Sequence, residues 1–447
     1  AAAPGSILIS ADTAALVSGY VVLEPLGPIR IKGIDAAMEV FEITRAGQAR
    51  SRLQVAAARG LTPFVGRAKE VRRILGALDR ARAAHGQLVA VVGEAGVGKS
   101  RLLWEFIHSE HTEGCLLLEG QAASYTKEMS YAPIIDLLRK YFEIEERQDQ
   151  DTIRVHVASR VQARDGALQP FIPAFLALLD VPVRDPEWVA LDPSLRRARA
   201  IEGIRRLVVS ESQGQPVVIA VEDLHWADSE TRSVLDAIVE TLPHSRILVL
   251  VSYRPDYERA WGSRSFYTHL RVDPLMPESV EALLSTLLGD DAGLGRLKDL
   301  VREQAGGNPL FLEESVRALV ETEALPGERG GYRLSRPVAA VQISPSVVSL
   351  LAARIDRLAE RDKHLLQSAS VIGKDVPAPL LVSIAEMPED DLRASLAALQ
   401  AGEFLYERSL FPDLEYTFKH ALTHEVAYGS LLRDRRRDLH GRIVDSI

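Results

Sequence analysis

Residues 93–100 read GEAGVGKS and match the pattern GxxxxGK[ST] at every fixed position. Glycines let a chain turn so that successive amide N–H groups point into one concavity, and a helix that follows adds its positive dipole end. Lys99 is placed to hold the β- and γ-phosphates of a nucleotide, and the Ser100 hydroxyl is placed to complete a Mg²⁺ shell. The residues expected to form this phosphate site are Gly93, Glu94, Ala95, Gly96, Val97, Gly98, Lys99, Ser100 and Arg101.

The stretches around this motif have the patterns that such a loop requires. Residues 88–92 are all apolar and predict a buried strand, and residues 101–108 predict a helix. A glycine-rich turn without function would leave Lys99 and Ser100 unexplained. Residues 216–223 and 246–254 predict two more buried strands, and helical spacing occurs at 70–84, 133–142 and 194–209. Strands that are apolar on both faces and separated by helices indicate an α/β fold with a parallel sheet.

Two carboxylates and an arginine follow the second and third predicted strands. Glu222 and Asp223 end one strand, where a sheet of this kind presents groups to a metal ion and to an attacking water. They are the candidate catalytic and Mg²⁺-binding acids, and the sequence leaves open which of them meets the metal. Arg254 ends the next strand and is a candidate contact for a γ-phosphate, whereas a solvated surface arginine is the alternative.

Composition limits the remaining possibilities. The chain has 447 residues, 47% of them hydrophobic and 26% charged, enough for about three domains of roughly 150 residues. Its net charge of −9 has the wrong sign for gripping nucleic acid, and Cys115 is the single cysteine. No apolar run approaches the ~18 residues of a membrane helix. We therefore expect a cytoplasmic protein without a membrane partner, and nucleic acid is the less favoured class of partner.

The regions before and after the predicted sheet have patterns that differ from those of the sheet itself. Helical spacing at 277–287, 296–304 and 310–321 predicts a small helical domain after the sheet. Four more helices are expected at 345–358, 362–372, 378–385 and 390–399, followed by the strand pair FLYER and LEYTFKH, which makes a winged-helix domain plausible. Residues 421–447 are expected to be helical. At the other end, strands are expected at 7–10 and 38–44, a short helix at 12–17, and a turn-rich stretch, LGPIRIKGID, at 26–35.

Several motifs occur in an order that resembles a known family. FVGR (64–67), GEAGVGKS, VEDLHWAD (221–228), SYRP (252–255) and GGNPLFLEE (306–314) look like the AAA-related signal-transduction ATPases, the STAND class, which includes NLR-type receptors and bacterial transcription activators. The likeness runs from Leu61 to the end. It implies a nucleotide-binding domain, a helical lid and a winged helix that hold ATP or ADP with Mg²⁺.

This resemblance also implies roles for single residues. Val65, Gly66 and Arg67 would line the adenine pocket, Pro309 would close over the base, and Arg254 would be the sensor; Ala68 stands where the family often has glutamate. FKHAL resembles the MHD stretch of NLR winged helices, so His420 would touch the β-phosphate of ADP, although Ala421 replaces the aspartate of that motif. A structural role is the alternative for His420. After the two acids, Trp226 is expected to pack under the lid and His225 to be a hydrogen-bonded loop residue.

The first residues resemble another family, the C-terminal end of a class III adenylate/guanylate cyclase domain. The similar stretches are PGSILIS, LGPIRIKGID and MEVFEI, and Lys32 matches a lysine that contacts substrate phosphates there. The metal-binding aspartates of that family would precede Ala1. We therefore expect this chain to be an internal segment of a longer protein that does not cyclise ATP by itself. The last residues, RRRDLHGRIVDSI, resemble the helix that leads into tetratricopeptide repeats.

These patterns give one domain scheme and three functional hypotheses. The expected domains are 1–46 (cyclase end), 47–60 (linker), 61–260 (P-loop domain), 261–335 (helical lid), 336–432 (winged helix) and 433–447 (start of a further helical region). The first hypothesis is a nucleotide-driven switch with slow ATP hydrolysis, attached to cyclase and repeat domains and responding to an unknown protein or small-molecule effector. A winged-helix DNA-binding regulator is the alternative, but the expected recognition helix begins with Asp390 and Asp391. A ring-type ATPase motor needs an arginine finger in trans, and no residue here identifies one.

Overall fold

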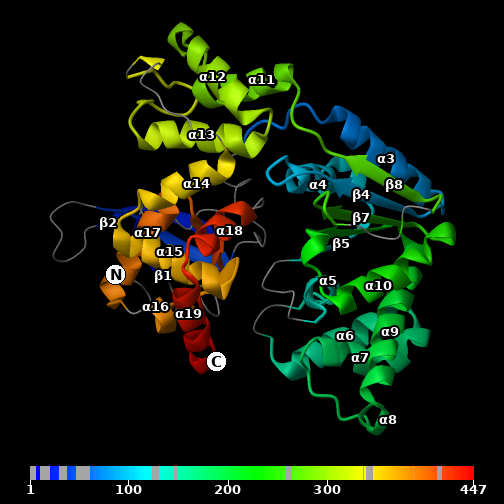
Figure 1. Ribbon diagram of the computed structural model, residues 1–447. Coiled ribbons are helices and arrows are strands. Elements are labelled where there is room, and N and C mark those ends of the chain that lie inside the picture. Colours follow the sequence, from blue (N-terminus) through cyan, green and yellow to red (C-terminus); the bar gives the residue numbers. More distant parts are fainter. Residues whose placement is uncertain are drawn as a thin grey trace. The chain divides into compact units, whose positions relative to one another are not determined.

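The computed structural model describes residues 7–10, 21–29, 38–46, 61–122, 130–144, 148–257, 261, 264–335, 337–338, 346–385, 387–409 and 415–446. The chain divides into two compact units (Figure 1). The sheet unit comprises residues 64–282 and 305–312. The helical unit comprises residues 1–63, 283–304 and 313–447. The division between them passes through α11 (Pro277–Leu288) and α13 (Pro309–Glu321), and it also separates the last residue of α12 (Gly295–Ala305) from the rest of that helix.

A five-stranded parallel sheet forms the centre of the sheet unit. Its order is β5-β6-β7-β4-β8, and every neighbouring pair is parallel. The strands are β4 (Gln87–Val92), β5 (Leu116–Gln121), β6 (Val217–Glu222), β7 (Ile247–Tyr253) and β8 (Tyr267–Arg271). All six residues of β4 are buried, because it pairs with β7 on one side and β8 on the other. The predicted α/β fold with a parallel sheet is confirmed.

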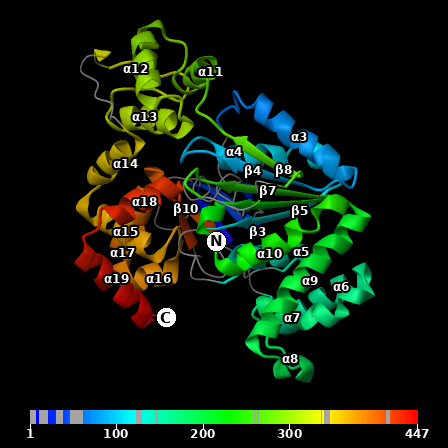
Figure 2. The same cartoon turned by 45° about the vertical axis from the view of Figure 1, so that its right-hand side comes forward.

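Alternate residues of each strand face different helical layers, which requires apolar side chains on both faces. Along β4, Val89 and Val91 pack against one layer, while Leu88 and Ala90 pack against the other. The first layer is α3 (Ala68–Arg82) and α4 (Lys99–Ile107). Figures 1 and 2 show the second layer on the opposite face. It contains α5 (Ala132–Tyr141), α6 (Gln150–Arg164), α7 (Ile172–Leu178), α8 (Pro186–Ala190), α9 (Pro193–Gly214) and α10 (Ser229–Val239).

Within this five-stranded sheet, the sequence analysis missed two strands, and both lie at its edges. β5 and β8 end the strand order, and their sequences, LLLEGQ and YTHLR, include polar residues. An edge strand has one neighbour and is covered less completely, so its apolar signal is weaker. The helices α6, α7 and α8 were also not predicted. By contrast, the strands at 88–92, 216–223 and 246–254 were found because their burial on both faces leaves nearly continuous apolar runs.

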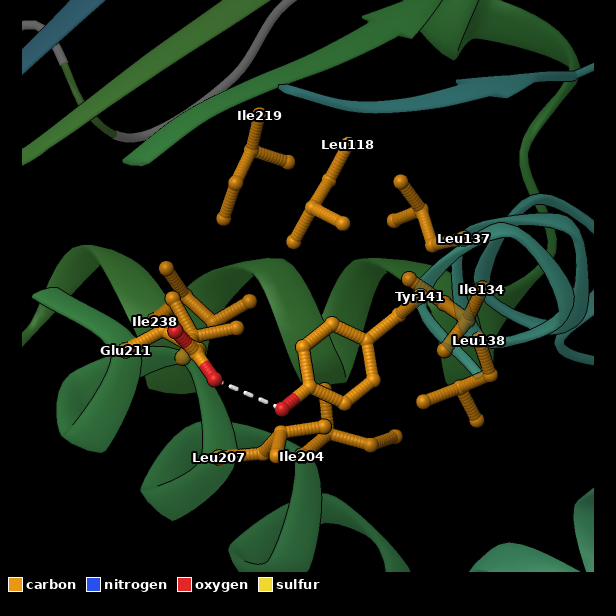
Figure 3. A pocket seen from close by; sticks show the side chains of 11 residues that line it. Leu118, Ile134, Leu137, Leu138, Tyr141, Ile204, Leu207, Glu211, Ile219 and Ile238 are labelled. Carbon is orange, nitrogen blue, oxygen red and sulfur yellow. Dashed lines mark hydrogen bonds between the residues drawn. The ribbon is translucent and has the colours of Figure 1, made fainter. Parts of the chain in front are cut away.

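A small internal cavity lies in the second layer of the sheet unit. It is bounded by α5, α9, α10 and the strands β5 and β6 (Figure 3). Its volume is about 20 Å³, enough for one water molecule. The one hydrogen bond drawn there runs from the Tyr141 hydroxyl to Glu211 Oε1, at 2.6 Å. Burial, and then this hydrogen bond, raise the pKa of Tyr141. The cavity is a packing defect of the core and is too small for a nucleotide.

The helical unit contains two small antiparallel sheets and several helices. β1 (Ile7–Ser10), β2 (Val21–Ile29) and β3 (Met38–Ala46) pair in the order β1-β3-β2. β9 (Asp375–Pro377), β10 (Leu405–Ser409) and β11 (Glu415–Phe418) pair in the order β10-β11-β9. The helices wholly inside the unit, or nearly so, are α12 (Gly295–Ala305), α14 (Val347–Asp356), α15 (Glu360–Ile372), α16 (Ala378–Ala385), α17 (Glu389–Ala401), α18 (Ala421–Gly429) and α19 (Arg433–Ser446).

Some expectations for this unit need correction. The expected turn at 26–35 begins inside a strand, because residues 26–29 belong to β2. The stretch 421–447 was expected to be helical, and its described residues contain two helices, α18, which ends at Gly429, and α19, which starts at Arg433. The expected helix at 12–17 and Lys32 lie outside the described residues. Among the residues that the structure describes, no helix is long and apolar enough to cross a membrane.

Candidate phosphate-binding site

The phosphate loop connects β4 to α4, as predicted. β4 ends at Val92 and α4 begins at Lys99, so Gly93–Gly98 form the connection. Gly98 caps the helix with a φ of 99°, a left-handed conformation that a side chain would disfavour. Because β4 is parallel to both its neighbours, its carboxyl end and theirs share one edge of the sheet. Ligands of open parallel sheets bind outside this edge.

Lys99 is a buried cation at the centre of the loop. It is 8% exposed, and its Nζ donates to the carbonyl oxygens of Gly93 at 2.8 Å and Glu94 at 3.0 Å. Burial lowers the pKa of Lys99, and the charge of Arg254 lowers it further, whereas nearby Asp223 and Glu222 oppose the shift. The ammonium group is thus held by backbone carbonyls in a site that favours loss of its charge. Such a site is stabilised when an anion binds.

The predicted strand-end residues gather around this lysine. Glu222 is the last residue of β6, and Asp223 follows it with a φ of 53°. The Asp223 N–H donates to the hydroxyl of Ser252, a fully buried residue of β7, at 3.0 Å. This bond fixes the sharp turn after β6. Arg254 comes directly after β7, and its charge is felt by Lys99. The structure therefore brings all four charged groups to one edge of the sheet.

Arg67 contacts the loop directly, which the sequence did not predict. Its side chain is 5% exposed, and Nη2 donates to the carbonyl of Val97 at 2.9 Å. Burial lowers the pKa of Arg67, while Glu70, 3.5 Å from Nη1, acts in the opposite direction. Its neighbours Val65 and Gly66 are half-buried and exposed, respectively. The adenine pocket assigned to these three residues stays a prediction.

Asn308 is a second loop contact that the sequence analysis missed. Its Nδ2 donates to the carbonyl of Ala95 at 3.0 Å, although the two residues are 213 positions apart. Two residues further on, the Leu310 N–H donates to the carbonyl of Gly96 at 3.3 Å. Pro309 lies between them as the first residue of α13, and its role over the base stays a prediction. The local signal was present, since asparagine before an N1 proline is typical of a helix cap.

Other residues near the motifs have local structural partners. The Arg101 guanidinium lies 2.7 Å from Glu105 and 5.8 Å from the ring centre of Phe64, so its nucleotide role stays a prediction. Asp228 caps α10 by accepting from the backbone N–H groups of Glu230 and Thr231 at 2.9 and 3.0 Å. The last acid of VEDLHWAD therefore serves the fold rather than the ligand.

His225 does not have the hydrogen bonds expected of it. Both ring nitrogens are buried, and within the described part of the chain neither has a hydrogen-bond partner. Burial lowers the pKa of this imidazole, and the positive charges of Arg254 and Lys99 lower it further. The negative charge of Asp223 acts in the opposite direction. The expectation of a hydrogen-bonded loop residue was wrong, because the turn after β6 buries the ring beside charged groups that do not bond to it. Trp226, next along the chain, packs against the core of the second layer.

Comparison with known proteins agrees with this geometry. Residues 63–251 match the model of the AAA ATPase domain, and they include the phosphate loop, the strand-end acids, the strands β4, β5 and β6, and all but the last two residues of β7. These residues form a P-loop ATPase module. Residues 277–333 match a domain of unknown function, DUF8739.

More distant similarities extend beyond the P-loop ATPase module. An uncharacterised protein, R02095 of Rhizobium meliloti (strain 1021), is 25% identical over 450 residues, which cover 100% of this chain and 43% of that protein. The chain thus spans less than half the length of this relative. A STAND protein with a tetratricopeptide repeat sensor from Pyrococcus horikoshii has a TM-score of 0.44 at 13% identity, covering 86% of this chain and 46% of its own. Drosophila ORC bound to DNA has a TM-score of 0.36 at 13% identity, with coverages of 90% and 96%.

The donor set of the P-loop ATPase module fits Mg²⁺. The Ser100 hydroxyl and the Glu222 and Asp223 carboxylates supply oxygen ligands, which this ion prefers. Within the described ranges, no group of three or more His, Cys, Asp or Glu side chains could hold a metal by itself. That result is expected for Mg²⁺, which is usually bound by one or two carboxylates together with substrate phosphates.

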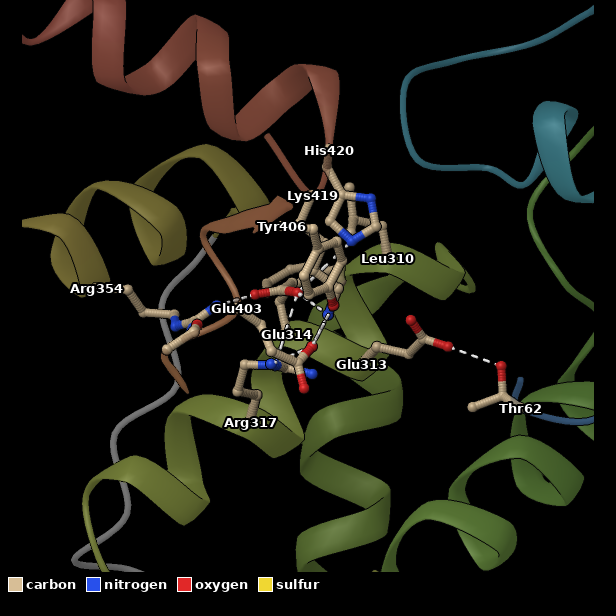
Figure 4. A network of polar contacts seen from close by, with 12 residues as sticks. Thr62, Leu310, Glu313, Glu314, Arg317, Arg354, Glu403, Tyr406, Lys419 and His420 are labelled. Carbon is tan, nitrogen blue, oxygen red and sulfur yellow. Dashed lines mark hydrogen bonds and ion pairs between the residues drawn. The ribbon is translucent and has the colours of Figure 1, made fainter. Parts of the chain in front are cut away.

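His420, the remaining predicted site residue, lies in the helical unit. It precedes α18, and its Nε2 is 3.8 Å from Glu314 Oε1 in a cluster of charged side chains (Figure 4). Glu314 is 1% exposed and also contacts Arg354 and Lys419. His420 therefore has an acidic neighbour within its own unit. Its contact with the β-phosphate of ADP stays a prediction.

Proposed function

We propose that the chain is the ATP-binding switch module of a larger signal-transduction protein. The observation that carries the proposal is the burial of Lys99, whose ammonium group is satisfied by loop carbonyls while Glu222, Asp223 and Arg254 surround it. Among the residues that the structure describes, no carboxylate forms an ion pair with Lys99, and a buried cation of this kind at the start of a helix is suited to a phosphate group.

This proposal gives a role to each candidate site residue. The N–H groups of residues 94–98 and the Lys99 ammonium group bind the β- and γ-phosphates. Ser100 and one strand-end carboxylate hold Mg²⁺, which neutralises phosphate charge when it is bound. The other carboxylate orients the attacking water, and Arg254 stabilises charge on the γ-phosphate. Val65, Gly66, Arg67 and Pro309 enclose the base, as the resemblance to STAND ATPases implies.

The flanking regions extend the proposal to the domain scheme. We assign residues 1–46 to the end of a class III cyclase domain, which their antiparallel sheet β1-β3-β2 supports. We assign residues 336–432 to a winged helix, which its helices and the sheet β10-β11-β9 support. ATP or ADP bound in the module then sets the arrangement of these domains, and slow hydrolysis resets it.

The alternative of a DNA-binding regulator has less support. α17, the expected recognition helix, opens with Glu389, Asp390 and Asp391. Its one basic side chain, Arg393, forms an ion pair with Glu389. A helix that reads the major groove needs basic or amide side chains directed at the bases.

Separating the two carboxylates tests the proposed chemistry. Glu222→Gln and Asp223→Asn are compared with the parent chain for Mg²⁺-dependent ATP binding by calorimetry and for phosphate release. One variant should lose the gain in affinity that Mg²⁺ gives, and the other should bind MgATP but lose hydrolysis. Glu240→Gln, which removes an exposed acid paired with Arg264, is the matched control. Unchanged turnover in both site variants would refute the assignment.

The nucleotide that remains after purification separates a switch from a motor. The protein is denatured, and the released nucleotide is identified by chromatography. Stoichiometric ADP supports a closed switch that keeps its product, whereas a chain that turns over rapidly and retains no nucleotide contradicts it.

A further inference from the structure

The carbonyl oxygens of the phosphate loop all have hydrogen-bond donors. Those of Gly93 and Glu94 accept from the Lys99 ammonium group. The next three, those of Ala95, Gly96 and Val97, accept from the Asn308 amide, the Leu310 N–H and the Arg67 guanidinium at 3.0, 3.3 and 2.9 Å. Two separate segments of the sheet unit, Arg67 and residues 308–310, thus donate hydrogen bonds to the carbonyl groups of the loop.

Holding these carbonyls also orients the N–H groups that would meet phosphate. A peptide unit is planar and trans, so its C=O and N–H point in opposite directions. The donor on the Ala95 carbonyl therefore directs the Gly96 N–H to the other side of the loop. In the same way, the donor on Gly96 directs the Val97 N–H, and the donor on Val97 directs the Gly98 N–H.

Asn308, which directly precedes α13, is one of the side-chain donors in this set. Its amide is used at both ends, because Oδ1 accepts from the N–H groups of Leu310 and Phe311 at 3.0 and 3.3 Å while Nδ2 reaches Ala95. An aspartate at this position would cap the helix equally well but would have no proton to donate. Asparagine is the side chain that serves both the helix and the loop.

The packing around Asn308 fixes its position within the unit. Gly96 has a φ of 78°, and a Cβ there would lie 2.9 Å from Asn308 Oδ1 and 2.8 Å from Leu310 Cβ. The close approach of α13 to the loop therefore requires glycine at this position. On the other side of Asn308, the Gly307 carbonyl accepts from the Leu275 N–H at 2.8 Å.

We propose that Asn308 is a positioning residue of the phosphate loop, through which the start of α13 sets the affinity for nucleotide. This inference rests on the proposed function, because it needs ATP to bind in the loop. Linkage makes the effect reciprocal: nucleotide bound in the loop stabilises the first turn of α13. The remainder of this helix belongs to the helical unit and carries Glu314.

The decisive variant is Asn308→Asp in the full chain. It keeps the helix cap and replaces the donor that faces the Ala95 carbonyl with an oxygen. We expect the affinity for MgATP, measured by calorimetry, to fall about tenfold or more, because a hydrogen bond is replaced by repulsion. The melting temperature without nucleotide should fall only slightly, because the helix cap is kept while one hydrogen bond is lost. Asp192→Asn exchanges the same two residue types at the cap of α9 and should not change MgATP affinity.

A second measurement does not depend on the stability of the variant. In the parent chain, MgATP should slow hydrogen exchange of the amides at residues 309–312, and Asn308→Asp should remove most of that protection. Parental MgATP affinity in Asn308→Asp, or no protection in the parent chain, would overturn the positioning role. Lys99→Met distinguishes the two proposals: if it also binds MgATP like the parent, the proposed function itself fails.

Discussion

Two buried cations of this chain are satisfied in opposite ways. In the helical unit, the Arg354 side chain is 1% exposed and contacts the carboxylates of Glu314 and Glu321. In the sheet unit, Lys99 is 8% exposed and its ammonium group meets only uncharged carbonyls among the described residues. The charges of the first centre pair with each other, whereas in the part of the chain that the structure describes no carboxylate forms an ion pair with Lys99.

The pKa shifts express the same difference. At Glu314, burial favours the neutral acid, but the charges of Lys419, Arg354, Arg317 and His420 lower its pKa to about 2. At Lys99, burial dominates and lowers the pKa of a cation, so the charged form is disfavoured. Buried charges that stabilise each other indicate a structural role, and a buried charge that its surroundings destabilise indicates a ligand site.

The largest effect expected from this comparison is on Glu314. Glu314→Gln leaves the buried Arg354 with one carboxylate fewer, and breaking one side of a buried ion pair costs about 3–5 kcal/mol of unfolding free energy. Denaturant unfolding, followed for the full chain, measures this loss. Glu240→Gln, at an exposed pair, should cost less than about 1 kcal/mol. Equal stability of Glu314→Gln and the parent would show that the cluster does not hold the helical unit together.

Lys99→Met is expected to separate binding from stability. The variant keeps a side chain of similar volume but removes the charge, so MgATP affinity should fall about 100-fold, the value of charged hydrogen bonds to phosphate. Stability without nucleotide should be unchanged or higher, because burial already disfavours this cation. Calorimetry and denaturant unfolding measure the two effects. A large loss of stability would show that Lys99 has a structural role like that of Arg354, and the difference between the two buried cations would disappear.

Acid should weaken the helical unit in a defined range. The carboxyl groups of Glu314 and Glu403 both have folded-state pKa values of about 2; for Glu403, burial opposes and the charges of Lys419 and Arg317 produce the lowering. Their unfolded value is 4.5, so the stability they add is complete above pH 4.5 and is lost as the pH falls from 4.5 towards 2. Lys99 acts in a different pH range and destabilises the fold at neutral pH: because its pKa is lowered, stability rises as the pH increases towards its ordinary value of 10.5.

The unfolding free energy as a function of pH tests this expectation. The parent chain should show a steep loss between pH 4.5 and 2, and Glu314→Gln should show a shallower one. An identical slope in the two proteins would contradict the low pKa of Glu314.

The sequence was sufficient for those parts of the fold and site that depend on local pattern. The strands β4, β6 and β7 are apolar along their whole length, and the loop motif with its strand and helix is contiguous in the chain. The sequence could not reveal contacts that the fold alone brings together. Asn308 meets the loop from 213 residues away, and the carbonyl that it bonds has no side-chain signature. Arg67 was assigned to the base, and only its burial against Val97 relates it to the loop.

The charged cluster was missed for a related reason. Glu314 closes the motif GGNPLFLEE, where two adjacent acids look equally solvated in the sequence. The structure distinguishes them, because Glu314 is 1% exposed among cations, whereas Glu313 accepts a hydrogen bond from Thr62 at 2.9 Å. Helical periodicity places one of two neighbours inward, but which partners it meets depends on residues 40 and 105 positions further along the chain.

The smallest expected effect concerns His420, which tests whether the two centres are truly separate. If His420 donates to the β-phosphate of ADP, His420→Ala should weaken ADP binding about fivefold, the value of one hydrogen bond, and should leave ATP affinity nearly unchanged. If it belongs only to the Glu314 cluster, the variant should lose a little stability and bind both nucleotides like the parent, because a pair at 3.8 Å with a partly exposed histidine contributes under about 1 kcal/mol. His364→Ala, an exposed histidine of the same unit, is the control. Calorimetric titration with ADP and with ATP in parallel decides between these two roles of His420. A loss of affinity for ADP alone would make His420 a nucleotide contact. Equal changes in ADP and ATP affinity, or none, would leave His420 as a member of the Glu314 cluster only.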